Sequence, residues 1–259
     1  MKLGIIISAL GSNLFKIKKW LSNDIMKIVH EIIIVVQRSG EFQYEIEGLK
    51  EMGCTLVIDD GLGVSRSRNI GIKKCTSDFF WILDDDIYSN LEMVKSIIYS
   101  IKSKNFDIYT FRIAHDYNGT LYKKYLNKQN VNKLQILKIS SIEMVISKKI
   151  IDNYSILFNE NFGLGSKYPS CEENLFLLEC FNYKVKIGHI PKIIVIHEQK
   201  GSGYLNISSD SLIAKGYVCS KFYFMGPFLL FYWYLKMIFK FRNFSSIKHL
   251  IKGYYLRKI

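Results

Sequence analysis

Short apolar runs alternate with amphipathic stretches along the first half of the chain. Runs rich in Ile, Val and aromatic residues predict strands at 2–8, 31–37, 54–58 and 79–87. Apolar positions at helical spacing predict helices between them, at 13–21, 41–52 and 64–74. Strands and helices that alternate at short intervals predict an α/β fold with a mostly parallel central sheet flanked by helices.

The second half is less regular. It predicts a helix at 90–103, strands at 107–113 and 142–147, a short helix or turn at 148–154, a helix from residue 172, and strands at 185–190 and 193–197. Residues 115–140 are polar and rich in Lys and Asn, which predicts an irregular region with one or two hairpin strands. Function is therefore sought first in the regular part of the chain.

Polar residues stand where the predicted strands end. Ser8, Gln37, the pair Asp59–Asp60 and the run Asp84–Asp86 each follow or close an apolar run. Ligands of parallel α/β sheets bind at the carboxyl ends of the strands. Because polar residues stand at the ends of several strands, we expect a single ligand-binding site along this edge of the sheet.

The run Asp84–Asp86 is the strongest single signal. In a strand, Asp84 and Asp86 share a face and Asp85 points away. Two such charges about 4 Å apart repel by roughly 4 kcal/mol at an effective dielectric near 20. A divalent cation would relieve this repulsion, and oxygen ligands suit Mg²⁺ or Mn²⁺ shared with substrate phosphates. The alternative is an acidic cap at the end of a strand whose charges are solvated.

A glycine-containing turn precedes the helix predicted at 64–74. Gly61 and Gly63 give a flexible loop, and Ser65 is suited to begin the helix. Arg66 and Arg68, with backbone donors at the helix start, are suited to bind a diphosphate. The alternative is a solvated basic helix that offsets the nearby aspartates. The position one strand before Asp84–Asp86 favours the diphosphate.

A second glycine loop, at 163–165, leads to Glu172 and Glu173 at the start of a helix. Acidic residues are stabilised there by the helix dipole in any protein. The functional interpretation is a general base beside the binding edge. His197 ends an apolar strand, where a histidine is either a satisfied core residue or a metal ligand.

Composition narrows the class of protein. The chain has 259 residues, 49% of them hydrophobic, which is ample for a sizeable core. A formal net charge of +13 indicates an anionic partner such as a nucleotide, a membrane surface or a nucleic acid. The five cysteines are scattered, which favours reduced thiols in a cytosolic setting. The apolar run after Met1 is short, so we expect a first strand rather than a signal peptide.

The tail differs from the rest of the chain. After Asp210 there is no acidic residue, and nine Lys or Arg residues occur. The apolar, aromatic run at 222–235 is shorter than the roughly 20 residues that a membrane-spanning helix needs. Its aromatic rings and flanking lysines favour the interface of an anionic bilayer. The alternatives are a core helix that closes the domain or an oligomer contact.

In their order along residues 1–200, these stretches resemble the family-2 glycosyltransferases with the glycosyltransferase-A fold. The matching pieces are the Gly-x-Ser-x-Ser-Arg-Asn-x-Gly turn at 63–71, Asp84–Asp86 as the Asp-x-Asp motif, the loop at 163–165, the Glu172–Glu173 pair and His197. Two features depart from the family pattern. The second strand ends in Gln-Arg-Ser-Gly (37–40) instead of acidic residues and Gly-Ser, and the base position carries Glu instead of Asp.

The resemblance implies a nucleotide-diphosphate sugar donor, which we expect to be UDP-linked. It also implies transfer of a hexosyl or N-acetylhexosaminyl group with inversion. It places the base at Glu173, with Glu172 as the alternative, and Mn²⁺ or Mg²⁺ on Asp86, Asp84 and His197. The residues expected to bind the donor are Ser8, Gln37, Asp60, Arg66, Arg68, Asp84 and Asp85.

By the same resemblance, residues 1–205 form the catalytic domain, with a nucleotide-sugar half (1–115) and an acceptor half (116–205). Residues 206–259 form a basic, aromatic helical tail that contacts an anionic membrane through 215–258. The expected acceptor is a glycan or an undecaprenyl-diphosphate-linked glycan, in the assembly of a bacterial capsule or O-antigen. The expected location is the inner face of the plasma membrane, and oligomer formation is left open.

Two other functions stay open on the sequence alone. A nucleotidyltransferase also uses paired aspartates and a metal, but it releases pyrophosphate. A basic module without catalysis would bind membrane or nucleic acid through its +13 charge. We expect no nucleic-acid partner, because the basic residues concentrate in an apolar, aromatic tail and no nucleic-acid-binding signature is present.

Overall fold

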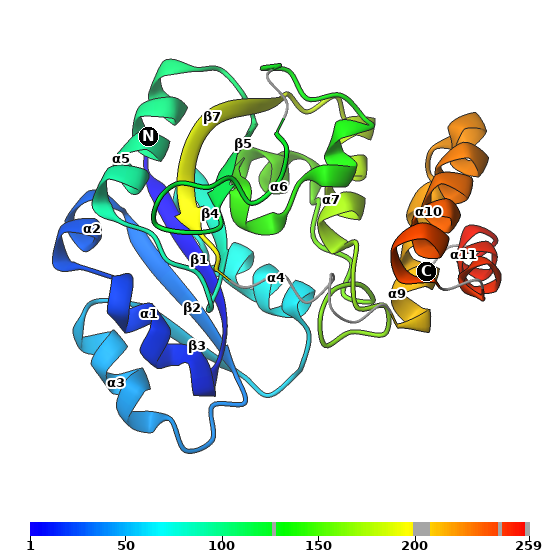
Figure 1. Ribbon diagram of the computed structural model, residues 1–259. Helices are drawn as coiled ribbons and strands as arrows, with labels where there is room; N and C mark the ends of the chain where they lie inside the picture. The colour runs from blue at the N-terminus through cyan, green and yellow to red at the C-terminus, as the bar shows by residue number, and fades with distance from the viewer. Residues whose placement is uncertain (126–127, 199–207, 243–244, 257–259) are drawn as a thin grey trace.

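A seven-stranded sheet forms the centre of the computed structural model, which describes residues 1–125, 128–198, 208–242 and 245–256. The strands lie in the order β3-β2-β1-β4-β6-β5-β7 (Figure 1). Their bounds are β1 Leu3–Leu10, β2 Glu31–Gln37, β3 Thr55–Asp59, β4 Phe79–Asp84, β5 Ile108–Ala114, β6 Met144–Ser147 and β7 Ile187–Ile196. Only β6 runs antiparallel to its neighbours among these strands. The predicted α/β fold with a mostly parallel sheet is confirmed.

Helices cover both faces of the sheet. One face is covered by α1 (Leu14–Trp20), α2 (Asn23–Ile28), α3 (Gln43–Glu51) and α5 (Leu91–Ser103). The other face is covered by α4 (Val64–Lys74), α6 (Lys148–Tyr154) and α7 (Glu172–Asn182). Strands buried on both faces need apolar residues at nearly every position, which explains the near-continuous apolar runs in the sequence.

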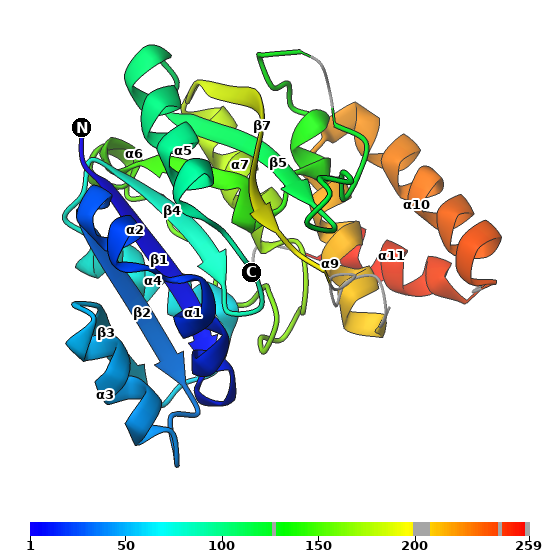
Figure 2. The same ribbon diagram turned by 60° about the vertical axis from the view of Figure 1, so that its left-hand side comes forward.

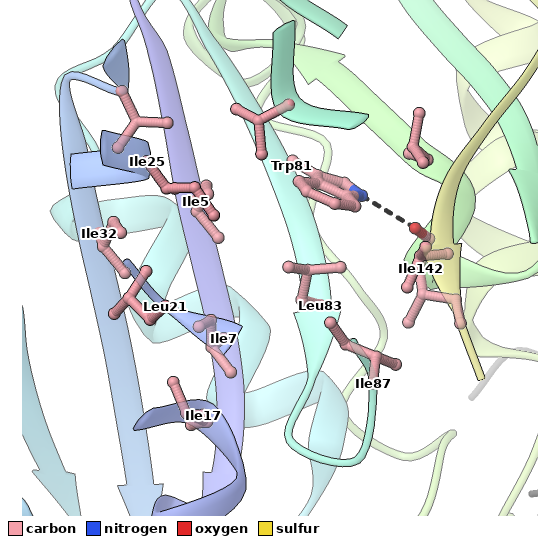
Figure 3. Packing of buried hydrophobic residues seen from close by; sticks show 14 of the residues in the cluster. Ile5, Ile7, Ile17, Leu21, Ile25, Ile32, Trp81, Leu83, Ile87 and Ile142 are labelled. Atoms are coloured by element: carbon pink, nitrogen blue, oxygen red, sulfur yellow. Dashed lines mark hydrogen bonds between the residues drawn. The ribbon is translucent and has the colours of Figure 1, made fainter. Parts of the chain in front are cut away.

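Successive residues of the central strands enter two separate apolar cores. Ile5 and Ile7 of β1 face the first core, and Ile6 between them faces the second. Figure 3 shows Ile5 and Ile7 beside the side chains of β4 in the first core. There Trp81 is fully buried, and its indole Nε1 donates a hydrogen bond to the Ile142 carbonyl oxygen at 2.8 Å. The buried indole therefore has the hydrogen-bond partner that it needs.

Most predicted elements are present, with four differences. The strand predicted at 79–87 ends at Asp84, and Asp85 and Asp86 lie in a turn, so strand alternation does not set their directions. The two strands predicted at 185–190 and 193–197 are one strand, β7, which continues through Pro191. This is possible because β7 is at the edge of the sheet, where a residue without an N–H is tolerated. The hairpin strands predicted within 115–140 are absent from its described part, which has an isolated bridge from Ala114 to Leu121 and a 3₁₀ helix at Gln135–Lys138. Helix α2 was not predicted.

The C-terminal helices form a group beside the sheet, on the side away from β3 and α3 (Figures 1 and 2). They are α9 (Ser209–Ser220), the 3₁₀ helix η4 (Tyr223–Met225), α10 (Gly226–Phe241) and α11 (Ser246–Tyr254). Helices α9 and α11 pack so closely that a Cβ added at Gly216 would lie 2.0 Å from the Leu250 carbonyl oxygen. Within the described ranges, no helix has both the length and the apolar character to cross a membrane.

Candidate active site

The carboxyl ends of the first four strands meet at one edge of the sheet. In the strand register, Ser8 at the end of β1 lies beside Asp84 at the end of β4. Gln37 at the end of β2 lies beside Asp59 at the end of β3. The edge predicted from the sequence therefore brings together residues that are far apart in the chain.

Arg68 on α4 is a buried cation shared by the two acidic motifs. Its Nη2 donates to Asp84 Oδ1 and its Nη1 donates to Glu172 Oε1, both at 2.9 Å. Nη2 also donates to Ser141 Oγ at 2.8 Å, and the guanidinium lies over the Phe158 ring. The Arg68 side chain is only 2% exposed, so its charge needs these partners. Arg68 thus fixes the acid at the end of β4 relative to the acid that opens α7.

The two glycine-containing loops contact each other next to this ion pair. Gly163 has a φ of +102°, a conformation that favours glycine. A Cβ added there would lie 2.7 Å from Val64 Cγ1 and 3.2 Å from the Glu172 carboxyl carbon. Ser65 Oγ donates to the Phe162 carbonyl oxygen at 2.6 Å. The close approach of the loop to α4 therefore requires glycine at 163 and sets the position of Glu172.

Asp85 is directed to the end of β1 instead of toward Arg68. Its carboxylate accepts hydrogen bonds from the Leu10 backbone N–H at 2.7 Å and from Asn13 Nδ2 at 3.1 Å. Burial raises the pKa of Asp85 to about 6. Asp85 therefore ties the ends of β4 and β1 together. A direct role in donor binding remains a prediction for it.

Ser8 presents a buried hydroxyl at the same edge. Its Oγ has no hydrogen-bond partner among the described residues, and the residue is 9% exposed. A buried hydroxyl without a partner is unfavourable, so a ligand or water is expected to bond to it. This supports the donor-binding role predicted for Ser8.

Asp86 and His197 face each other across the edge. His197 Nε2 lies 3.4 Å from Asp86 Oδ2. Burial by itself lowers the pKa of His197, but the hydrogen bond and charge of Asp86, with the charge of Asp84, raise it overall. The residue before His197, Ile196, is bridged to Tyr88 in the loop after β4. This bridge places His197, which follows β7, next to the aspartates at the end of β4.

The Asp86–His197 pair fits a divalent metal. Adjacent ligand atoms in an octahedral Mg²⁺ shell are about 3 Å apart, close to the observed separation. The carboxylate oxygen of Asp86 suits Mg²⁺ or Mn²⁺, and the imidazole nitrogen of His197 would complete the shell. No group of three His, Cys, Asp or Glu side chains able to hold a metal occurs within the described ranges. A metal here would need further ligands from the donor diphosphate and water, and Asp84 is engaged by Arg68 instead.

Gln37, Asp59 and Arg66 form a second polar network at the far end of the edge. Gln37 Nε2 donates to Asp59 Oδ2 at 2.8 Å, and Gln37 Oε1 accepts from the Gly63 N–H at 3.2 Å. Arg66 Nη2 donates to Asp59 Oδ1 at 2.9 Å. The predicted donor residue Asp60 is exposed, whereas its neighbour Asp59 is held in the network. Burial along β3 does not alternate regularly and Asp60 lies beyond its end, so the sequence pattern does not separate the two aspartates.

Glu172 and Glu173 have different surroundings. Glu172 is buried and bound to Arg68, whereas Glu173 is only partly buried. Burial and the charge of Glu172 raise the pKa of Glu173 to about 8, against the opposing charge of Arg68. A general base works best when its pKa lies near the operating pH. Of the two residues, Glu173 is therefore the better suited to exchange a proton with a substrate.

Helices on both faces of a mostly parallel sheet, with acidic motifs held together at its carboxyl edge, are the arrangement of the glycosyltransferase-A fold. The profile of glycosyl transferase family 2 matches residues 24–160, and the chain belongs to this family. No curated protein matches the chain significantly in sequence.

Two similar solved structures show the same fold. S. aureus TarS 1–349 in complex with UDP-GlcNAc has a TM-score of 0.66 and 16% identity, over 96% of this chain and 76% of that chain. Glucosyl-3-phosphoglycerate synthase from Mycobacterium tuberculosis, in complex with Mg²⁺ and UDP, has a TM-score of 0.55 and 12% identity, over 85% of this chain and 78% of that chain. At these identities the likeness extends to the fold. The predicted family and fold are confirmed.

Proposed function

We propose that this protein transfers a hexosyl or N-acetylhexosaminyl group from a UDP-linked donor to a hydroxyl group of a glycan acceptor, with inversion at the anomeric carbon. The observation that carries the proposal is the double ion pair of Arg68 with Asp84 and Glu172. It holds the end of β4, where a donor would bind, next to the glutamate pair that would supply the base. The UDP complexes of TarS and of the synthase support the choice of UDP.

In the proposed reaction Glu173 accepts the proton of the acceptor hydroxyl. The acceptor oxygen attacks the anomeric carbon from the face opposite the diphosphate, and the bond from that carbon to the diphosphate oxygen breaks. Its electron pair leaves with UDP. Asp86 and His197 would hold Mn²⁺ or Mg²⁺, which when bound neutralises the diphosphate charge. Ser8, Gln37, Asp60, Arg66, Asp84 and Asp85 are the residues proposed to position the donor.

We also propose that the acceptor is a lipid-linked glycan, of the undecaprenyl-diphosphate type, in bacterial capsule or O-antigen assembly. An enzyme that meets such an acceptor works at the inner face of the plasma membrane. The basic, aromatic tail after Asp210 supports this setting, because it combines apolar rings with positive charge. In this proposal residues 1–115 bind the donor and 116–205 bind the acceptor.

The reaction products test the proposed activity against a nucleotidyltransferase. With Mn²⁺ and a panel of UDP-sugars that includes UDP-GlcNAc, we expect UDP release, and with UTP and the matching sugar 1-phosphates we expect no pyrophosphate. The UDP-sugar that is turned over is also expected to raise the melting temperature of the protein more than the others do. Chromatography of the nucleotide products measures the first outcome, and thermal unfolding measures the second. Release of pyrophosphate would contradict the glycosyltransferase proposal.

The pH dependence of kcat/KM is expected to follow Glu173. A base acts when it is deprotonated, so kcat/KM should rise about tenfold per pH unit below the Glu173 pKa and level off above pH 8. Glu172 raises the pKa of Glu173 and Arg68 lowers it. The midpoint of the pH profile therefore reports the coupled titration of these charged groups and not of Glu173 alone. Steady-state rates between pH 6 and pH 9.5 measure the profile. A rate that falls with rising pH over this range would contradict the assignment.

A further inference from the structure

Helix α10 has two apolar faces, and only one of them is covered. The inner face places Met237, with Leu230, Trp233 and Tyr234, against Leu212 of α9 and Leu250 of α11. The opposite face carries exposed aromatic side chains at helical spacing. Their exposed fractions are 72% for Phe228, 58% for Phe231, 58% for Tyr232 and 82% for Phe239.

This outer stripe of Phe228, Phe231, Tyr232 and Phe239, hereafter the aromatic stripe, is too apolar to be ordinary surface. The adjoining η4 residues Tyr223 and Phe224 are 79% and 83% exposed and extend it. Figure 2 shows α10 at the outer limit of the molecule, away from the sheet. A continuous exposed apolar surface of this kind marks an interaction site.

Positive charge lies along one side of the aromatic stripe, because Lys236 and Lys240 are four residues apart on α10. Lys236 Nζ lies 4.4 Å from the centroid of the Trp233 ring, and Lys240 Nζ lies 5.5 Å from that of Phe241. Because no acidic residue follows Asp210, the tail carries no compensating negative charge. This combination of rings and basic residues matches the interfacial region of an anionic bilayer.

The fold adds a second basic segment that lies elsewhere in the sequence. Lys133 donates to the Lys221 carbonyl oxygen at 3.2 Å, and its Nζ lies 5.3 Å from the Tyr223 ring centroid. The segment around Lys133 therefore adjoins the N-terminal end of α10. It also presents three exposed lysines, Lys124, Lys128 and Lys138, around a cavity of about 30 Å³. Through Lys133, this lysine-rich segment contacts the residues that immediately precede the aromatic helix.

We propose that a composite surface, the aromatic stripe together with Lys124, Lys128 and Lys138, binds the anionic phosphates and the acyl boundary of a lipid bilayer. A second copy of the chain fits less well, because two tails that each have nine Lys or Arg residues and no acidic residue after Asp210 would repel each other. This proposal adds to the proposed function the surface through which the enzyme reaches a lipid-linked acceptor. It rests on the proposed function only for its biological purpose. Arg257 and Lys258 of the predicted membrane segment lie outside the described residues.

Vesicle flotation of the full chain, without donor or acceptor, tests the aromatic stripe. We expect flotation with phosphatidylglycerol-containing vesicles and little with pure phosphatidylcholine. The triple variant Phe228→Ser, Phe231→Ser, Phe239→Ser should bind at least tenfold more weakly. The control Tyr44→Ser, Tyr99→Ser removes rings that are 82% and 73% exposed on α3 and α5, and should bind like the wild type. Unchanged melting temperatures show that the variants are folded.

A second variant tests the composite nature of the surface. Each lysine near an anionic bilayer contributes about 1 kcal/mol, or about fivefold in affinity. Lys124→Gln, Lys128→Gln, Lys138→Gln should therefore weaken vesicle binding about 100-fold, whereas the control Lys73→Gln, Lys74→Gln, Lys102→Gln should not. Binding that is unchanged in the first variant would overturn the contribution of the loop.

Three outcomes separate this proposal from the proposed function. Wild-type protein that transfers sugar to a soluble acceptor but ignores anionic vesicles overturns the membrane surface alone. Protein that binds vesicles without transferring sugar overturns the activity alone. A wild-type dimer by light scattering that becomes monomeric in the Phe228, Phe231, Phe239 variant, without vesicle binding, assigns the stripe to a second copy and overturns the proposal.

Discussion

Replacing Glu173 with glutamine is expected to lower turnover by about 10²–10⁴-fold, the usual contribution of a positioned general base. Glutamine keeps the size of the side chain but cannot accept the acceptor's proton. Affinity for the UDP-sugar should survive, because Asp84, Asp86 and Arg68 are unchanged. UDP release measures turnover, and titration calorimetry with the donor measures affinity.

The matched control is Glu179→Gln, which removes an exposed carboxylate from the same helix. It should leave turnover and donor affinity unaltered. Glu172→Gln is expected to behave differently from both, because it leaves Arg68 buried with one carboxylate fewer. That variant should lower the melting temperature as well as the rate. Normal turnover in Glu173→Gln would remove this residue from the mechanism and return Glu172 to consideration.

The sheet could be predicted from the sequence because its strands are buried on both faces. β2 and α4 have the predicted bounds, and the continuous Ile–Val run of β2 favours a buried strand. Ser65 does not begin α4 as predicted, because Gly63 is the N-cap and the Ser65 hydroxyl donates to the Phe162 carbonyl oxygen. The edge strand β7 was divided in two because Pro191 ordinarily interrupts a strand. The proline is acceptable because β7 is at the edge of the sheet and because its register with β5 shifts between His189 and Ile193, and both are tertiary properties.

The sequence predicted which residues form the candidate site, but it did not predict which of their side chains bond to each other. The sequence indicated Arg68 as a diphosphate ligand, whereas the structure pairs this arginine with Asp84 and Glu172. Such a pairing depends on α4 and α7 lying on the same face of the sheet. The sequence pattern gave each helix an apolar face, but it did not tell which face of the sheet that helix covers. The roles of Glu172 and Glu173 separate only when that packing is known.

Replacing Asp86 with alanine is expected to abolish the metal-dependent part of donor binding. A metal held by few protein ligands depends strongly on each of them, and Asp86 faces His197 at 3.4 Å with no third acidic or histidine partner among the described residues. In calorimetry, Mn²⁺ should increase the donor affinity of the wild type and leave that of the variant unchanged. Without Mn²⁺ the two proteins should bind the donor equally weakly.

Two further variants locate the metal within the acidic run. Asp24→Ala removes an exposed carboxylate from α2 and should retain the full response to Mn²⁺. Asp84→Asn should retain part of the response but lower the melting temperature, because Asp84 is bound to the buried Arg68. If Asp84→Asn lost the Mn²⁺ response and Asp86→Ala kept it, the metal would belong on the other aspartate. Arg68 would then have to release Asp84 when the donor binds, and its pairing with Glu172 would link donor binding to the position of Glu173.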